Sequence, residues 1–382
     1  MRKVYVLGVG QSQFGKLRQF TATDLGTQAA AAAVADAGID PRLLQVAYGG
    51  RAVDGSTTVQ DILKNLGVTQ IEMNNVENAC ASGITAVNLL WRDIACGVYD
   101  VGIAVGVEAM TTSSLAGKLL GANKDDINGQ VGMSMPGYFA LMTRRFMAAT
   151  GATAEDMAYP SWKNHKNGVL NPYAMYKKEL SIEEIVSSRV ISDPITLYEC
   201  CPTTDGAAAV IYCSEDFARR YTSRLIEVRA SKCLSACYED PKSDILGFPM
   251  ARRLAQETYA LAGIGPEEID CVELHDAFSP EEIWAYSDLG LCRPEDVLDF
   301  IHSGAAEIGG KCAVNASGGL LSLGHPLGAS GVRVVCEIAL QLRGDAGAHQ
   351  VSGAKVGLAQ MMGGFLSGLQ APIAEGIQIL TR

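Results

Sequence analysis

The sequence predicts an α/β fold in which mixed, mostly parallel sheets pack around buried helices, with the same unit built twice. Strand-like apolar runs alternate with helix-like runs along the chain, which is typical of sheets covered on both faces. Short motifs recur in the same order at similar spacing. The chain has 382 residues, of which 48% are hydrophobic, enough for one large or two medium cores.

The first half shows strands and helices in alternation before an interruption. Thr23 is a suitable N-cap for an alanine-rich helix, and Gly38 is a suitable end for it. Continuous apolar runs indicate strands that are buried within the sheet. We expect strands over residues 4–9, 45–48, 71–76, 101–107 and, after the interruption, 207–213, with helices over residues 24–37, 59–66 and 81–95.

Two motifs of the first half return in the second. Ala37-Gly38-Ile39-Asp40-Pro41 reappears as Ala262-Gly263-Ile264-Gly265-Pro266, an offset of 262 − 37 = 225 residues. Cys80-Ala81-Ser82-Gly83 is echoed by Asn315-Ala316-Ser317-Gly318, an offset of 315 − 80 = 235 residues. Two echoes in one order favour duplication over chance recurrence of alanine and glycine. The sites of the two halves are then expected to face each other.

The segment between the halves differs in character. It holds a methionine- and proline-containing stretch at residues 133–138 and a polar, basic stretch at residues 162–168. We interpret residues 113–198 as an inserted lid. The domain organisation is therefore expected to be a first half over residues 1–222, including this lid, and a second half over residues 223–382.

Composition excludes several classes of protein. A formal net charge of −11 argues against a nucleic-acid partner, because phosphate binding needs clustered lysine and arginine. No apolar run reaches the length of a membrane span, so we expect a cytoplasmic protein without a membrane partner. The 11 cysteines are irregularly spaced, which fits a reducing compartment. Four cysteines could be imagined as a metal site: Cys200, Cys201, Cys233 and Cys237. They lack the CxxC pairs of a zinc ribbon, so no metal site is predicted.

Cys80 lies where the strand at residues 71–76 is followed by the helix at residues 81–95. Free backbone N–H groups and the positive end of the helix dipole converge at such a position and favour a thiolate. Such a placement is how a protein makes a cysteine nucleophilic. The alternative, an ordinary buried cysteine, is the default for one of 11 cysteines, and the spacing alone does not overturn it.

Six sequence blocks in order resemble the thiolase superfamily, and specifically its sterol-carrier-protein-type branch. Each block is weak alone, but together they span most of the chain and imply the thiolase fold. The blocks are Glu77-Asn78-Ala79-Cys80-Ala81-Ser82-Gly83, Lys163-Asn164-His165-Lys166 with Asn171-Pro172-Tyr173, Cys200-Cys201-Pro202-Thr203-Thr204-Asp205-Gly206, His275-Asp276-Ala277-Phe278, Asn315-Ala316-Ser317-Gly318-Gly319, and Gly324-His325-Pro326.

The resemblance implies a role for each catalytic residue. Cys80 would attack the keto carbon of a 3-oxoacyl-CoA, and CoA would later collect the acyl group from the sulfur. His325 would accept the cysteine proton, and His275 with His325 would stabilise the enolate oxygen. The N–H groups of Cys80 and Gly364 would form a second oxyanion pocket. The alternative for His325 is a turn histidine held by backbone hydrogen bonds, and the alternative for His275 is a core or capping histidine. The segment that contains Gly364 could instead be merely the tight end of the last strand.

CoA is expected as a substrate, with no tightly bound cofactor and no metal. By the same resemblance, Lys163, His165 and Lys166 would contact its nucleotide part, and Ser317 and Gly318 would also line the CoA site. Without the resemblance, the basic stretch reads equally well as a solvated charged loop. The acyl group could be aromatic or fatty. Lid residues that could line its pocket are Tyr138, Phe139, Tyr173 and Met175.

The sequence departs from the thiolase pattern at the second catalytic cysteine. Most thiolases use that thiol to protonate the departing enolate, but this chain has Ala277 and Met362 at the two places where it occurs. General acid–base help is worth roughly 10²–10⁴-fold in rate, so a replacement is expected. One of the two histidines is the first candidate, with Tyr173 or Glu281 in reserve.

The His-Asp-Ala-Phe variant resembles archaeal and bacterial acetoacetyl-CoA and benzoylsuccinyl-CoA thiolases that work beside a small zinc-ribbon/OB-fold subunit. It implies a homodimer that recruits such a partner. The alternatives are an aldolase or CoA-synthase chemistry on the same fold, or a non-catalytic scaffold that binds acyl-CoA. Retention of Cys80, His275 and His325 together argues against the scaffold.

Overall fold

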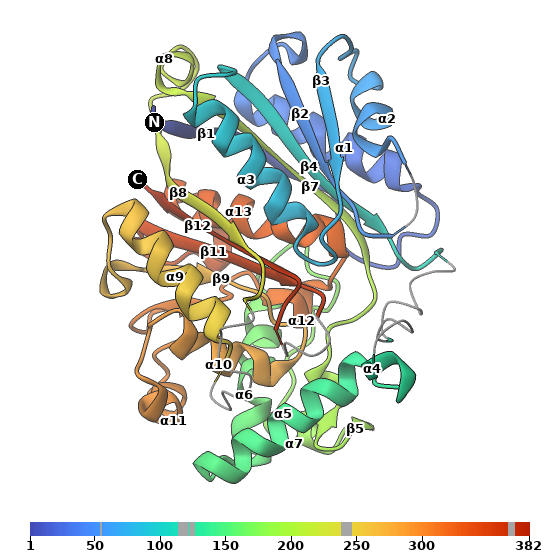
Figure 1. Cartoon of the computed structure of the whole chain (residues 1–382), viewed down its shortest axis with the longest axis vertical. Coiled ribbons are helices and arrows are strands. Elements are labelled where there is room, and N and C mark those ends of the chain that lie inside the picture. Colours follow the sequence, from blue (N-terminus) through green and yellow to red (C-terminus); the bar gives the residue numbers. More distant parts are fainter. Residues whose placement is uncertain (54–55, 114–120, 122–126, 238–246, 366–370) are drawn as a thin grey trace.

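The chain folds into layers of sheet and helix, with α3 (Ser82–Ala95) and α13 (Leu327–Arg343) packed against each other in the interior (Figure 1). The computed structural model describes residues 1–382 except 54–55, 114–120, 122–126, 238–246 and 366–370. One sheet of ten strands runs through the molecule in the order β10-β9-β11-β12-β8-β1-β7-β4-β2-β3. The amino and carboxyl termini lie near each other beside the middle of this sheet (Figure 1).

The first half carries the strands from β1 to β7 that belong to the large sheet. α1 and α2 cover the outer face of this half of the sheet, while α3 lies on the inner face and contacts strands of both halves. Its elements are β1 (Val4–Gln11), α1 (Ala22–Ala37), a 3₁₀ turn (Pro41–Leu43), β2 (Val46–Gly50), α2 (Thr58–Lys64), β3 (Glu72–Val76), α3 (Ser82–Ala95), β4 (Val101–Ala109), β7 (Asp205–Ser214) and α8 (Glu215–Ala218).

The second half repeats this arrangement. α9 covers its outer face against β8 and β12, and α13 lies inside against α3. Its elements are β8 (Ile226–Leu234), α9 (Pro249–Ala262), a 3₁₀ turn (Pro266–Glu268), β9 (Cys271–Glu273), α10 (Ser279–Asp288), a 3₁₀ turn (Pro294–Asp296), α11 (Val297–His302), β10 (Ala313–Val314), α12 (Gly319–Leu323), α13 (Leu327–Arg343), a 3₁₀ turn (Gly347–His349), β11 (Val356–Gly363) and β12 (Ala374–Thr381).

The predicted duplication is confirmed by the strand order. From the junction outwards, the strand order is β1-β7-β4-β2-β3 in the first half and β8-β12-β11-β9-β10 in the second. The order is therefore the same in both halves, with β1 corresponding to β8 and β7 to β12. The repeated Ala-Gly-Ile motif has one structure in both halves, because Gly38 and Gly263 end α1 and α9 in the left-handed conformation. The predicted boundary between residues 222 and 223 stays a prediction; three residues separate it from β8.

The sheet is mixed rather than parallel throughout. β2 pairs in parallel with β3 and β4, and β9 pairs in parallel with β10 and β11. The strands around the junction, β7, β1, β8 and β12, pair antiparallel with their neighbours. The carboxyl ends of β3 and β9, which precede Cys80 and His275, therefore lie in parallel regions, where ligand sites of α/β folds occur.

Two local predictions are wrong in detail. α1 begins at Ala22, because Thr21 and not Thr23 caps it, in a reciprocal capping box with Asp24. β3 was expected to be buried but is largely exposed, because it is the last strand of the sheet and exposes Glu72, Asn74 and Asn75. Its polar residues suit an edge position.

The predicted lid at residues 113–198 contains both surface and core elements. Its elements are α4 (Ile127–Gln130), α5 (Met135–Thr150), α6 (Ala154–Gly168), α7 (Ile182–Val186), β5 (Val190–Ser192), β6 (Ile195–Thr196) and a 3₁₀ turn (Leu197–Glu199). α6 packs against α10 and α12 and so belongs to the core of the second half. Residues 114–120 and 122–126 of the lid lie outside the described residues.

The two central helices approach each other closely. A Cβ atom on Gly83 of α3 would lie 2.6 Å from the backbone oxygen of Gly328 and 2.8 Å from the backbone nitrogen of Val332 on α13. Only glycine fits there, and the contact fixes the start of α3 against α13. Cys80 and His325 each lie just before one of these two helices. Within the described part of the chain, no helix combines the length and the apolar character that crossing a membrane requires.

Candidate active site

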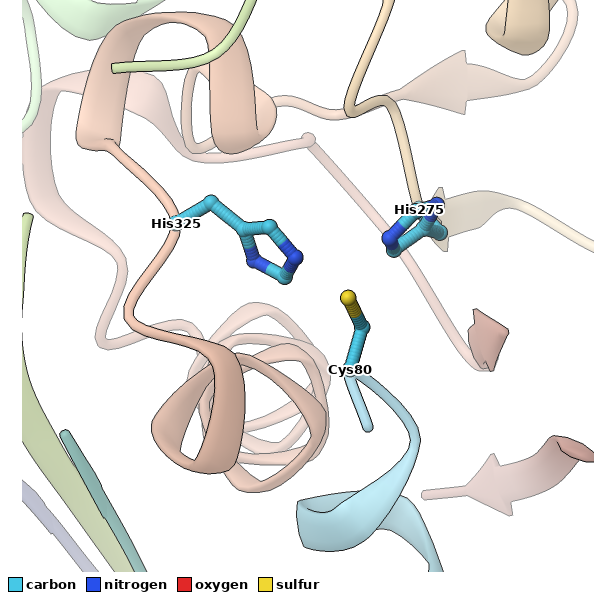
Figure 2. Close-up of side chains that lie close together, drawn as sticks. All are labelled: Cys80, His275 and His325. Atoms are coloured by element: carbon cyan, nitrogen blue, oxygen red, sulfur yellow. The ribbon is translucent and has the colours of Figure 1, made fainter. Parts of the chain in front are cut away.

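Cys80 lies in a tight turn between β3 and the start of α3, as the sequence predicts (Figure 2). Ala79 has a positive φ of 50°, which an alanine adopts only when its surroundings hold it there. Ser82 supplies part of that restraint, because its Oγ accepts from the backbone nitrogen of Asn78 at 2.9 Å and donates to the backbone oxygen of Ala79 at 2.6 Å. The turn presents the Cys80 thiol, which is partly exposed, to a cavity.

The structure brings Cys80, His275 and His325 together. The Cys80 Sγ and one ring nitrogen of each histidine all lie within 4.8 Å of one another. The two imidazole rings meet edge to face, with centroids 5.2 Å apart. Cys80 comes from the first half and both histidines come from the second (Figure 2). The Nε2 atoms of both histidines are buried and have no hydrogen-bond partner among the described residues.

His275 follows the end of β9, where two contacts fix it. Its backbone nitrogen donates to Gln360 Oε1 at 2.9 Å, and its Nδ1 lies 2.6 Å from Glu281 Oε1 on α10. Burial alone would lower the pKa of His275, but the Glu281 carboxylate and the neighbouring Cys80 sulfur raise it to about 10. His275 is therefore an imidazolium at neutral pH, with Nε2–H directed at the cavity.

His325 lies in the opposite electrostatic state. Its Nδ1 lies 2.8 Å from Ser330 Oγ, which itself donates to the backbone oxygen of Pro326 at 3.0 Å. Ser330 must then accept from His325 Nδ1–H, so the Nε2 atom carries a lone pair. Burial and the charges of His275 and Arg333 hold the pKa of His325 well below its usual range. One imidazole is thus ready to donate a proton and the other to accept one.

The three side chains open into a cavity of about 270 Å³. Among the residues that the structure describes, its polar side chains are those of Cys80, Cys200, Cys201, Thr203, His275 and His325. The remaining lining is apolar. It consists of Ala79, Met110, Met135, Pro136, Phe139, Ile191, Leu197, Pro202, Ala277, Phe278, Leu327, Met362, Gly363, Gly364 and Phe365.

Gly363, the glycine at the end of β11, approaches the backbone around Cys80. A Cβ atom on Gly363 would lie 2.4 Å from the backbone oxygen of Asn78 and 2.9 Å from the backbone nitrogen of Cys80. Gly364 follows with a φ of 60° and lines the cavity. This close approach suits an oxyanion pocket built from backbone N–H groups. The role of the Gly364 N–H stays a prediction.

Two predicted contacts with the CoA nucleotide are wrong. Lys163 is fully buried, and its Nζ lies 2.9 Å from Glu282 Oε1 and 2.6 Å from Asn164 Oδ1. His165 is also buried, and burial lowers its pKa to about 4. Its ring lies 5.8 Å from that of Tyr176. Both side chains face the core because α6 packs against α10 and α12.

Ser317 and Gly318, the other two residues predicted to line the CoA site, do not line the cavity. Ser317 is fully buried, donates to Glu273 Oε2 at 2.6 Å and accepts from Arg333. Gly318 packs against α6, where an added Cβ atom would lie 2.8 Å from Gly168 Cα. Lys166 is the basic residue of this set that reaches the surface, where its Nζ pairs with Glu307 at 3.0 Å. Its contact with CoA stays a prediction.

The predicted acyl-pocket residues divide in the structure. Phe139 lines the cavity, and Tyr138 packs behind it with its ring centroid 4.4 Å from that of Phe365. Tyr173 and Met175 do not line the cavity, so Tyr173 is poorly placed as the replacement acid. Glu281 acts on His275 instead of facing the cavity. The sequence signal for this contact was that Glu281 lies in the first turn of the helix that follows the His-Asp-Ala-Phe segment.

The cysteine and two histidines are also the kind of donors that bind soft metals. They form the one such three-residue group among the residues described. The proton on His275 competes with a metal for its lone pair. Cys200, Cys201, Cys233 and Cys237 do not form a group of this kind within the described parts of the chain.

Comparisons with known proteins agree with this geometry. Residues 4–216 match the thiolase N-terminal domain, and residues 238–375 match the thiolase C-terminal domain-like family. The chain is 41% identical over 353 residues to the benzoylsuccinyl-CoA thiolase subunit BbsB of Thauera aromatica, covering 92% of this chain and 91% of the relative. It is 37% identical over 375 residues to an acetyl-CoA acetyltransferase of Methanothermobacter thermautotrophicus, covering 95% and 97%.

A solved structure titled "Ltp2-ChsH2(DUF35) aldolase" has the same fold. It superimposes with a TM-score of 0.85 at 24% identity, covering 99% of this chain and 97% of that one. Human mitochondrial 3-ketoacyl-CoA thiolase gives a TM-score of 0.74 at 18% identity, covering 100% and 98%. Both domain matches, the relatives and the convergence of one cysteine with two histidines lead to one conclusion: this chain belongs to the thiolase family of acyltransferases.

Proposed function

We propose that this protein cleaves a 3-oxoacyl-CoA with CoA, or performs the reverse Claisen condensation, through an acyl thioester on Cys80. One observation carries the proposal. Two imidazoles with opposite protonation states direct their Nε2 atoms at a single sulfur inside an apolar cavity. Such a set can remove the thiol proton and at the same time stabilise the negative charge that develops on a substrate oxygen.

The residues divide the reaction as follows. His325 Nε2 accepts the Cys80 proton, and the sulfur attacks the keto carbon, C3. The N–H groups of Cys80 and Gly364 stabilise the oxygen of the tetrahedral intermediate. When the C2–C3 bond breaks, its electron pair becomes the enolate of the departing acyl-CoA, whose oxygen accepts from His275 and His325. A CoA thiolate then removes the acyl group from Cys80.

The cavity favours a bulky or aromatic acyl group. Phe139 and Phe278 stack with ring centroids 4.5 Å apart, and Phe365 meets Phe139 edge to face. Such walls bind a flat or branched apolar group with more contact area than an acetyl group offers. The relative named as a benzoylsuccinyl-CoA thiolase subunit supports this choice, while the acetyl-CoA acetyltransferase supports acetoacetyl-CoA as the second substrate to compare.

The proposed assembly is a homodimer with a small zinc-ribbon/OB-fold subunit. The exposed edge strand β3 offers backbone groups for pairing with a second copy. The word "subunit" in one relative's name and the two-component title of the aldolase structure support a second polypeptide. Co-expression with its genomic neighbours should give a complex heavier than a homodimer by light scattering, whereas a fully active homodimer alone would contradict the partner.

Mass spectrometry tests the acyl intermediate directly. Mixing the protein with an aromatic 3-oxoacyl-CoA in the absence of free CoA should add the mass of the acyl group to the peptide that contains Cys80. Acetoacetyl-CoA is the short-chain comparison, and Cys80→Ser is the control that should carry no thioester. No adduct with any chain length would support a non-catalytic scaffold. An adduct without thiolysis when CoA is added would support condensing chemistry of another type.

A further inference from the structure

The proposed thiolysis leaves one proton unassigned. When the C2–C3 bond breaks, carbon C2 of the departing enolate must receive a proton before acyl-CoA leaves. His325 holds the proton of Cys80, and His275 holds the enolate oxygen. Neither ring is then free to protonate carbon without giving up its stabilising role. The cavity has to supply another acid, or the enolate has to wait for water.

Few side chains in the cavity are able to supply it. Beyond the catalytic three, the protic groups among the described lining residues are Cys200, Cys201 and Thr203. An alcohol such as Thr203 is too weak an acid to donate readily to an enolate. The Cys200 thiol is engaged elsewhere, because its Sγ donates to the backbone oxygen of Thr196 at 3.4 Å. These two considerations leave Cys201.

Cys201 is held against the segment that carries His275. Its backbone nitrogen donates to the backbone oxygen of Ala277 at 2.9 Å, and the adjacent Cys200 bridges to Phe278. Cys80, Cys201, His275 and Ala277 all line one cavity, so a substrate on Cys80 lies within the same small space as the Cys201 thiol. The alanine at position 277 carries no acid of its own.

The electrostatics suit a proton donor. Burial, together with the neighbouring Cys200 and Cys80 sulfurs, raises the pKa of Cys201 well above its usual range. The Cys201 thiol therefore keeps its proton at neutral pH until a base as strong as an enolate carbon arrives. Nucleophilic attack by Cys201 itself is disfavoured for the same reason.

We propose that Cys201 is the general acid and base for carbon C2 in this reaction. The inference rests on the proposed function. In cleavage, the Cys201 S–H bond breaks, its proton forms the new C2–H bond of the departing acyl-CoA, and the electron pair stays on the Cys201 sulfur. The thiolate then takes the proton of incoming CoA, whose thiolate attacks acyl-Cys80. In condensation, the CoA thiolate released when Cys80 is acylated takes the Cys201 proton, and the Cys201 thiolate then removes the C2 proton of the second acyl-CoA.

Two half reactions test this assignment. Transfer of an acyl group from acyl-CoA to Cys80 needs no proton at C2, whereas exchange of the C2 hydrogens of acetyl-CoA in D₂O does. Cys201→Ala should lower the exchange rate and the kcat of thiolysis by roughly 10²–10⁴-fold, with acyl transfer to Cys80 changed by only a few fold. Cys201→Ser, which keeps the size but not the acidity, should resemble Cys201→Ala.

Controls separate this role from a structural one. Cys233→Ala removes another half-buried thiol, one whose pKa is raised to about 12 and which does not line the cavity, and it should leave both rates unchanged. Normal exchange in Cys201→Ala, or loss of exchange in Cys200→Ala instead, would overturn the assignment to Cys201 while leaving the thiolase proposal intact. Absence of acyl transfer to Cys80 in the unmodified protein would overturn both.

Discussion

Replacing Cys80 by serine is expected to lower the kcat of thiolysis by roughly 10⁴-fold or more. An alcohol holds its proton far more tightly than a thiol, so the low pKa of His325 makes this ring too weak a base to activate a serine. Substrate binding should change little, because the cavity walls remain. The rate of CoA-dependent cleavage of an aromatic 3-oxoacyl-CoA, followed by absorbance, measures the effect.

A surface thiol provides the matched control for this substitution. Cys96 is exposed at the end of α3, outside the cavity, and Cys96→Ser should keep full activity. Thiolysis that survives in Cys80→Ser at more than a few per cent of the original kcat would show that the carbon–carbon bond is cleaved without a covalent cysteine intermediate. Aldol-type chemistry on the same fold would then become the better reading.

Replacing Glu281 by glutamine is expected to shift the pH dependence of the reaction. In the unmodified protein the pKa of His275 is about 10, so its proton is present at neutral pH and is lost only as the pH rises through about 10. Glutamine removes the charge that offsets burial, so the pKa of His275 falls. The charge on His275 is then lost at a lower pH, and kcat at pH 8 should fall by about 10²–10³-fold, the value of one oxyanion donor.

The direction in which the pH profile shifts distinguishes an electrostatic role of Glu281 from a purely structural one. In Glu281→Gln the alkaline limb of the kcat profile should move to lower pH, so that some activity returns as the solution is made more acidic. Glu199→Gln is the control, because Glu199 is also buried but bonds Thr196 instead of a catalytic histidine. Equal loss of activity at every pH would mean that Glu281 only holds α10 in place.

The resemblance of six sequence blocks to the thiolases pointed to Cys80, His275 and His325, and the structure brings these three side chains together. The strand followed by a helix at Cys80 was a weaker signal that did not by itself distinguish a nucleophile from a buried cysteine. What the sequence could not provide was the burial of long polar side chains. Lys163 reads as a surface lysine because its buried partner, Glu282, lies 119 residues later on α10. Its contact depends on how α6 packs, which no local pattern records.

Edge position and cavity lining are similarly non-local properties. The polar residues Glu72, Asn74 and Asn75 were a usable signal that β3 is exposed, but the apolar residues Ile71, Met73 and Val76 suggested burial. Cys201 was a candidate metal ligand and lies in one of the six family blocks, but nothing in the sequence marked it as an acid or base. Its interest comes from the hydrogen bond to Ala277 in the other half of the chain.

The three side chains of the proposed active site come from both duplicated halves, which has a consequence for biosynthesis. The sulfur of residue 80 is made early, whereas its proton acceptor is made 245 residues later, since 325 − 80 = 245. A polypeptide that stalls on the ribosome, or that loses its carboxyl-terminal portion to a protease, therefore carries a thiol with no imidazole beside it. The proposed catalysis therefore requires both halves of one folded chain, and a chain truncated before residue 275 is expected to lack it.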